Sequence, residues 1–134
     1  MQQTRSKNQT GNVRQTLEQQ RAQDAWQQAE VGIKQHDKDY VNDAKGLPAL
    51  IMNSGLMQVM AFLHQKQGRH ETLGRQLREW LSKRFPQQLK DAEFASFMEA
   101  MMKASPHDYQ AINREAFAWL KWLRQMASAR KGGE

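Results

Sequence analysis

The sequence predicts an all-α fold, a compact bundle of about five or six helices. Apolar residues recur at three- and four-residue spacing through most of the 134 residues, which is the pattern of helices that bury one face. β-branched residues are scarce and nowhere alternate with polar ones, so no segment is predicted as a strand. A chain of this length buries about two-thirds of its unfolded surface, enough for one core without disulfides or metals.

The first helix is expected from about Asn12 to a point between His36 and Asp39. Small residues recur along its apolar face at three- and four-residue spacing, which would let a neighbouring helix approach closely. These small residues are Ala22, Ala25, Ala29 and Gly32.

The segment from Tyr40 to Gly55 is expected to be punctuated by two breaks. Gly46 suits the end of a helix, and Pro48 suits the first turn of a short helix that follows. Gly55 then interrupts the chain before a helix expected over residues 56–67.

Three further helices are expected in the second half of the chain. The first carries the apolar residues between Leu73 and Phe85 and ends at Pro86, since proline cannot continue a helix interior. The second runs over about residues 91–104. In the last, Ser105 is expected as the N-cap and Pro106 as the first helical residue.

These elements form one predicted domain over residues 12–130. Residues 1–11 are rich in Gln, Thr, Asn and Ser and have too few apolar side chains to order themselves. We expect them to be a flexible tail. The last helix is expected to fray, leaving residues 131–134 as a second flexible tail.

The composition excludes several kinds of chemistry. The chain has no cysteine, which removes disulfides, thiolate zinc sites, iron–sulfur clusters and a cysteine nucleophile. The four histidines lack the spacing of a metal site, and no nucleotide-binding glycine loop occurs. We therefore expect a protein that is not an enzyme and that has no cofactor and no metal.

No segment approaches the roughly 20 apolar residues of a membrane helix. The first residues lack the apolar core of a signal peptide. We expect a soluble, cytoplasmic protein.

Positive charge is concentrated in three segments. The formal net charge is +6, and residues 1–21, 69–84 and 114–134 each carry +3. Such segregation is typical of a surface that binds phosphates. The alternative, solvated helix faces that maintain solubility, stays open at this point.

The helical segments contain four tryptophans. Trp26, Trp80 and Trp119 share faces with Leu or Ala, and core anchoring is the preferred interpretation for all three. Trp122 lies about 60° outside the apolar face of the last helix, at 3.6 residues per turn. It is the indole expected to reach a partner.

The punctuated segment resembles a known family. Its signature residues are Tyr40, Lys45, Leu47-Pro48-x-Leu50-Ile51, Gly55-Leu56 and Ala61-Phe62-Leu63. They are similar to the signature region of the small subunit of type III-B (Cmr) CRISPR effector complexes. Where the family often has Asn-Gly-Leu, this chain has Ser54-Gly55-Leu56, which keeps the glycine of the turn.

The resemblance implies a non-catalytic helical subunit in antiviral defence, present in several copies. Its implied partners are CRISPR backbone subunits and other effector subunits, guide RNA and target RNA, and copies of itself. No membrane partner is implied. By analogy with other RNA-guided complexes, base pairing selects the sequence and protein supplies a basic channel.

We expect the RNA backbone to contact arginines and lysines on polar helix faces. Arg21 and Lys45 stand at family-like positions. The full set of candidates is Arg14, Arg21, Lys38, Lys45, Arg114, Lys121 and Arg124. The basic residues of segment 69–84 fit either RNA or acidic patches of neighbouring subunits.

Two alternative functions stay open. One is a free-standing helical adaptor or nucleic-acid-binding regulator, although neither a recognition helix nor a dimer seam is evident. The other is a structural spacer, which keeps the fold and uses its basic faces only to dock neighbouring proteins.

Overall fold

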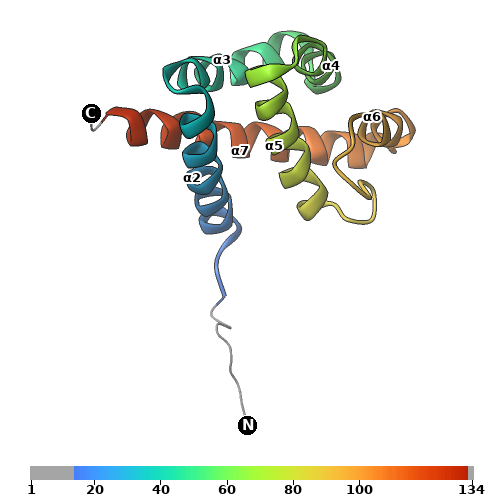
Figure 1. Ribbon diagram of the computed structural model, residues 1–134. Coiled ribbons are helices and arrows are strands. Elements are labelled where there is room, and N and C mark those ends of the chain that lie inside the picture. The colour runs from blue at the N-terminus through green and yellow to red at the C-terminus, as the bar shows by residue number, and fades with distance from the viewer. Residues whose placement is uncertain (1–13, 133–134) are drawn as a thin grey trace.

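The computed structural model describes residues 14–132, and this part of the chain contains six helices and no strand. The all-α prediction is therefore confirmed. The helices are labelled as in Figure 1: α2 (Leu17–His36), α3 (Lys38–Ser54), α4 (Leu56–Lys66), α5 (Gly68–Arg84), α6 (Phe94–Lys103) and α7 (Pro106–Gly132).

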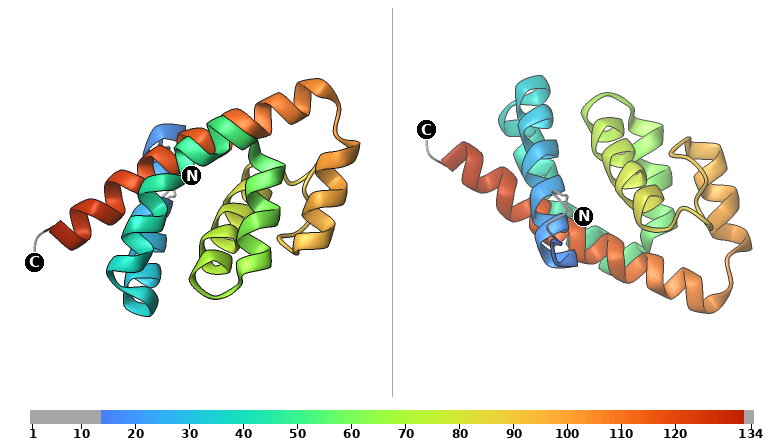
Figure 2. Two further views of the ribbon diagram at one scale, coloured as in Figure 1. Left: turned by 90° about the horizontal axis from the view of Figure 1, so that it is seen from above. Right: turned by 90° about the horizontal axis from the view of Figure 1, so that it is seen from below.

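Helix α7 is the longest helix and the spine of the fold (Figures 1 and 2). Helices α2, α3 and α5 pack against it, and α4 pairs with α5. Helix α6 lies at the other end of α7 from the α2–α3 pair (Figure 2). The buried face of α7 repeats at three- and four-residue spacing: Ile112, Ala116, Trp119, Leu120, Leu123 and Ala127.

Small residues bring α2 close to its neighbours, as the sequence predicts. Ala25 and Ala29 are fully buried. Gly32 lies directly against the ring of Tyr40 at the start of α3, and the Tyr40 hydroxyl donates a hydrogen bond of 2.7 Å to Gln76 of α5. The α2–α3 turn is thus fixed to α5.

Helix α2 begins at Leu17, five residues later than predicted. Thr16 is its N-cap: the side chain accepts a hydrogen bond from the backbone of Gln19, and the Gln19 side chain accepts one in return. This reciprocal capping box satisfies two backbone donors that would otherwise lack partners. The proposed tail, residues 1–11, lies outside the described residues.

The prediction of two helical segments between Tyr40 and Gly55 is wrong, because α3 runs unbroken through Gly46 and Pro48. Proline in a helix interior removes one backbone hydrogen bond. Here burial of Leu47, Pro48 and Ile51 against the core offsets that loss. The local glycine and proline signals are overridden by tertiary packing.

The chain turns instead at residues with positive φ. Asp37 (φ 54°) separates α2 from α3, Gly55 (φ 86°) separates α3 from α4, and Gln67 (φ 59°) precedes α5. Positive φ is costly for residues other than glycine. The positions of all three breaks agree with the sequence, which predicts a helix end between His36 and Asp39, an interruption at Gly55 and a helix over residues 56–67.

The predicted C-terminal boundaries are close to the observed ones. Helix α5 ends just before Phe85 and Pro86. The Ser105 hydroxyl accepts a 3.1 Å hydrogen bond from the backbone of Asp108, which confirms the N-cap. Helix α7 then continues through Gly132, so Lys131 is helical where the sequence predicted a tail.

Two glycine substitutions test the close approach of α2 and α3. A Cβ at Gly32 would overlap the ring of Tyr40, whereas a Cβ at Gly46 meets nothing within 4 Å. We expect Gly32→Ala to lower the free energy of unfolding by about 1–3 kcal/mol through overpacking. Gly46→Ala should raise it by about 0.5–1 kcal/mol, because alanine is the better helix former.

Urea denaturation of the two variants measures both changes. Equal effects of the two substitutions would contradict the packing described for Gly32.

Candidate nucleic-acid interface

A buried carboxylate, Glu115 of α7, gathers cations from two other helices. Its side chain is 4% exposed and accepts two hydrogen bonds of 2.8 Å from the Arg21 guanidinium of α2. The Trp80 indole of α5 donates a third, of 3.0 Å, and Arg84 of α5 lies 3.5 Å away. One carboxylate thereby joins α2, α5 and α7.

A second buried acid, Asp24, lies on the same helix as Arg21. It accepts a hydrogen bond of 2.8 Å from the Trp119 indole, and the Lys83 ammonium is 3.6 Å away. Burial raises the pKa of Asp24 and outweighs the lowering effect of Lys83 and Trp119. Ionised Asp24 therefore has a net cost in the fold.

The pKa of Glu115 shifts in the opposite direction from that of Asp24. Burial alone would raise its pKa, but the hydrogen bonds from Arg21 and Trp80 and the charges of Arg21 and Arg84 together hold the pKa below its ordinary value. Ionised Glu115 therefore stabilises the fold.

Arg21, the family-like candidate for RNA contact, is thus engaged inside the protein. Its side chain is only 18% exposed and is held by Glu115 and, at 3.4 Å, by Glu18. The bidentate geometry is that of a strong charge-assisted pair. A guanidinium in this position serves the packing of α2 on α7, and an RNA role for Arg21 stays a hypothesis.

The arginines and lysines of segment 69–84 also pair within the chain. Arg78 is the most deeply buried, 1% exposed; it donates to Glu71 at 2.7 Å and to the carbonyl of Ala92 at 2.7 Å. This fixes the segment before α6 to α5. The other pairs of the segment are Arg69–Asp43, Arg75–Glu79, Lys83–Asp24 and Arg84–Glu115.

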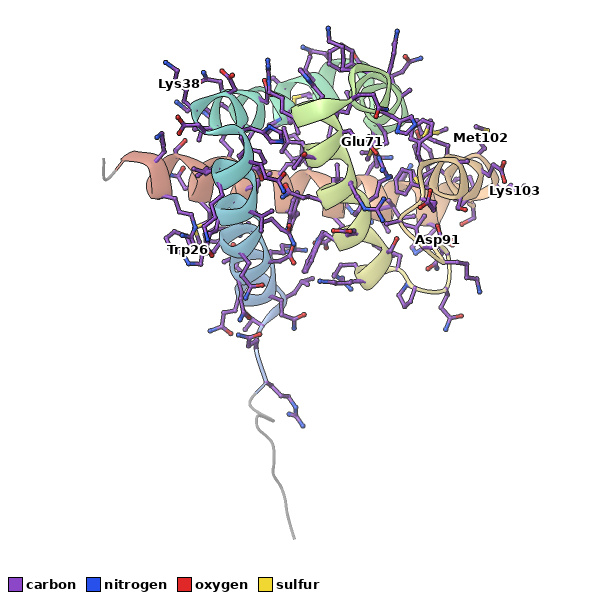
Figure 3. All side chains as sticks on the ribbon, viewed as in Figure 1. Trp26, Lys38, Glu71, Asp91, Met102 and Lys103 are labelled. Carbon is purple, nitrogen blue, oxygen red and sulfur yellow. The ribbon has the colours of Figure 1, made fainter. Side chains whose placement is uncertain are left out.

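The remaining predicted cations stay at the surface. Six of the seven are exposed and take part in none of the ion pairs within residues 14–132: Arg14, Lys38, Lys45, Arg114, Lys121 and Arg124. Arg14 precedes α2, and the other five lie on α3 and α7. Figure 3 shows Lys38 on the outer side of α3.

The five helical cations lie on α3 and α7, which pack together. Lys38, Lys45 and Met52 follow one another at seven-residue spacing, so they share one face of α3 with a drift of about 20° per step. Arg114 and Lys121 have the same spacing on α7.

A groove of about 500 Å³ lies between these faces. Its lining residues are Ile51, Met52, Asn113, Arg114, Phe117, Ala118 and Lys121. We call the groove, taken together with the exposed Lys38 and Lys45 of α3 and Arg124 of α7, the α3–α7 face.

Phe117 is the groove residue that sequence reasoning missed. The Lys121 ammonium lies 5.8 Å from the centre of its ring, and Arg114 is three residues away on the same helix. Phe117 stands three and four residues from the two cations, and that spacing was the available signal.

Trp80 and Trp119 are buried, as predicted. The prediction for Trp26 is wrong: its side chain is 41% exposed. It lies on Arg130 of α7, whose guanidinium carbon is 3.6 Å from the ring centre. The fourth indole, Trp122, is half-buried between α7 and α2.

Two negative findings apply to residues 14–132. This part of the chain holds no group of three His, Asp or Glu side chains placed to bind a metal ion. None of its helices combines the length and apolar character that crossing a membrane requires.

Comparisons with known proteins agree on one class, the CRISPR-associated proteins. The sequence model of the CRISPR-associated protein Cmr5 family matches residues 17–130. A crystal structure of a CRISPR-associated Cmr5 family protein from Thermus thermophilus matches with a TM-score of 0.69 and 28% identity, covering 86% of this chain and 97% of the other. The search of curated proteins gave no match.

The chain belongs to the Cmr5 family, the small subunit of type III-B Cmr effector complexes. The family resemblance seen in the sequence is confirmed.

The pKa values of Glu115 and Asp24 shift in opposite directions. Replacing each carboxylate by its amide should therefore have different effects on the free energy of unfolding. At pH 7 Glu115→Gln should lower the free energy of unfolding by at least about 2 kcal/mol. A hydrogen bond to a charged group contributes about 1.5–3 kcal/mol to that free energy. Asp24→Asn should leave it unchanged or raise it, because the neutral amide can still accept from Trp119 while the burial cost of the ionised carboxylate disappears.

Urea denaturation over a pH series checks the cause. The Glu115 deficit should shrink as pH falls through the lowered pKa of the folded protein, where the wild-type carboxylate is protonated too. The Asp24 difference should shrink as pH falls through the raised pKa of Asp24. A Glu115→Gln deficit that stays constant down to about pH 3 would contradict the ion-pair explanation.

Proposed function

We propose that this subunit is non-catalytic and lines the channel of a cytoplasmic type III-B ribonucleoprotein, where its α3–α7 face binds the phosphates of guide or target RNA. One observation carries the proposal. Five predicted cations on two packed helices stay exposed and outside the ion pairs of residues 14–132, whereas every arginine and lysine of segment 69–84 is paired.

The side chains of the α3–α7 face suit the phosphates of an RNA backbone. Lysine acts as a point charge toward phosphate, and arginine offers a two-pronged donor. Arg114 and Lys121 line the groove on its α7 side, and Lys38 and Lys45 lie on α3, the helix that supplies the other side. Binding of this kind is independent of sequence, which is sufficient where base pairing with the guide selects the target.

The proposed partners follow from the same chemistry. A single subunit with a few phosphate contacts binds RNA weakly, and several copies along one strand convert weak contacts into avidity. We therefore include copies of the chain itself, with backbone and other effector subunits, among the partners. Arg14 stands just before α2 and would extend the basic surface.

Charge reversal on the α3–α7 face tests the proposal. We expect Lys45→Glu, Arg114→Glu and Lys121→Glu, combined in one subunit and assembled into the effector complex, to weaken target RNA binding. For each copy of the subunit on the RNA, the plot of log K against log salt should become shallower by about 2, because each neutralised phosphate on a single strand contributes about 0.7.

The matched control is the same reversal elsewhere on the surface. Lys66→Glu, Lys90→Glu and Lys103→Glu change three exposed cations outside the α3–α7 face. The control complex should keep the wild-type slope. Equal slopes for wild type and the α3–α7 variant would refute RNA binding by this face and leave the structural spacer as the function.

A further inference from the structure

Helices α2 and α7 meet along two rows of residues at four-residue spacing. The rows are Glu18, Ala22, Trp26 and Glu30 on α2, and Ala118, Trp122, Met126 and Arg130 on α7. Residues four apart form a ridge on a helix surface, so each row is continuous. We call the line where these two rows meet the α2–α7 seam. The proposed phosphate surface does not use either of its indoles.

Trp26 lies flat on a cation at one point of the seam. The Arg130 guanidinium carbon is 3.6 Å from the centre of the indole, and Arg130 also donates to the carbonyl of Trp26 at 2.9 Å. Arg130 is 22% exposed, whereas Trp26 is 41% exposed. The guanidinium thus backs the ring, and the indole is the more exposed of the two. Figure 3 shows Trp26 on the outside of the molecule, beside α2 and α7.

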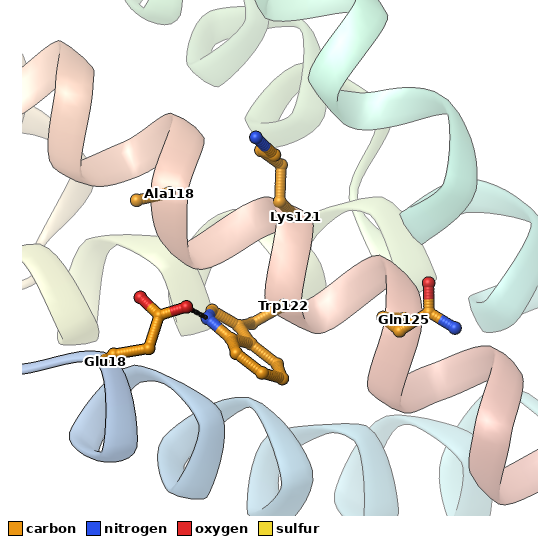
Figure 4. Close-up of a pocket in the computed structure, with 5 residues that line it drawn as sticks. All are labelled: Glu18, Ala118, Lys121, Trp122 and Gln125. Atoms are coloured by element: carbon orange, nitrogen blue, oxygen red, sulfur yellow. Dashed lines mark hydrogen bonds between the residues drawn. The ribbon is translucent and has the colours of Figure 1, made fainter.

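Trp122 occupies the other point of the seam. Its indole donates a hydrogen bond of 3.0 Å to Glu18 and lines a hollow of about 310 Å³ with Glu18, Ala118, Lys121 and Gln125. Figure 4 shows the Trp122 ring turned toward α2 and Lys121 projecting from the opposite side of α7. Trp122 is thus next in sequence to a cation of the proposed RNA surface.

The two indoles are spaced along the seam by a fixed distance. The contacts Glu18–Trp122 and Trp26–Arg130 each join residues 104 apart, so they lie eight residues apart on both helices. Eight residues rise about 12 Å. Each nucleotide of a strand spans about 3.4 Å or more, so a short single-stranded segment reaches both rings.

We propose that the α2–α7 seam binds single-stranded RNA by stacking unpaired bases on Trp26 and Trp122. This inference rests on the proposed function and adds a requirement on the RNA: the bases that bind must be unpaired. Aromatic side chains reach the face of a base only when that base leaves its duplex stack. Stacking is tolerant of sequence, since every base has a flat face.

The charges of the seam favour RNA over an apolar peptide. The two carboxylates of the seam lie near cations: Glu30 pairs with both Lys34 and Arg130, and Glu18 shares Arg21 with Glu115. The exposed cation Lys121 lines the same hollow as Trp122. An apolar helix would need large aliphatic contacts, and apart from Ala22 and Ala118 the two rows offer only Met126, which is half-buried.

NMR of the full-length chain tests the inference, and it detects weak binding. The four indole N–H signals are assigned by single substitutions, and a single-stranded RNA octamer is added at low salt. Signals of Trp26 and Trp122 should move, while those of buried Trp80 and Trp119 serve as internal controls. The same octamer in a duplex should leave all four in place.

A pair of substitutions separates stacking from apolar contact. Trp26→Leu should weaken binding of the single-stranded octamer by about 5- to 100-fold, and Trp26→Tyr should retain most of the affinity, because only the second keeps a ring. Thermal melting confirms that both variants are folded.

The outcomes distinguish this inference from the proposed function. Salt-dependent RNA binding with unmoved Trp26 and Trp122 signals would overturn the stacking site and leave the phosphate surface intact. Equal affinity of Trp26→Leu and wild type would also overturn it. Absence of RNA binding both by the chain and by its assembled complex would overturn both proposals.

Discussion

The ion pair between Arg21 and buried Glu115 is the contact on which the arrangement of helices depends. Breaking a buried pair is far more costly than forming it is favourable, because the remaining charge loses its partner. Glu115 receives Arg21 from α2 and Trp80 and Arg84 from α5, so α7 cannot slide against either helix without losing a charged hydrogen bond. The small residues Ala25 and Ala29 then let α2 approach close enough for that contact.

The same pairing divides the positive charge of the molecule into two classes. Cations of α5 pair with acids of the same chain and hold helices and the segment before α6 in place. The cations that the sequence predicts to bind RNA on α3 and α7 are exposed and take part in none of those pairs. They are Lys38, Lys45, Arg114, Lys121 and Arg124. A net charge of +6 therefore indicates little by itself, while its distribution over ion pairs indicates which face is available to phosphate.

Periodicity and capping residues predicted most of the fold, and long-range pairing explains what they missed. Ser105 and Pro86 mark helix boundaries by local chemistry. Gly46 and Pro48 give the same kind of signal, yet burial of Leu47 and Ile51 keeps α3 continuous. The sequence predicts an RNA contact for Arg21, because it does not show that the carboxylate partner of Arg21, Glu115, lies 94 residues away. The sequence predicts Trp26 in the core because it shares a helix face with Leu and Ala, but the ring lies outward on Arg130.

Ultraviolet crosslinking of target RNA in the assembled effector complex, with mass spectrometry of the crosslinked peptides, tests the central claim most directly. RNA binding by the α3–α7 face predicts crosslinks to peptides of α3 that carry Lys45 and to peptides of α7 that carry Phe117, which lines the groove. Crosslinks confined to α5 and α6, where the arginines and lysines of α5 pair within the chain, would contradict it. So would a complex that captures target RNA with no crosslink to this subunit.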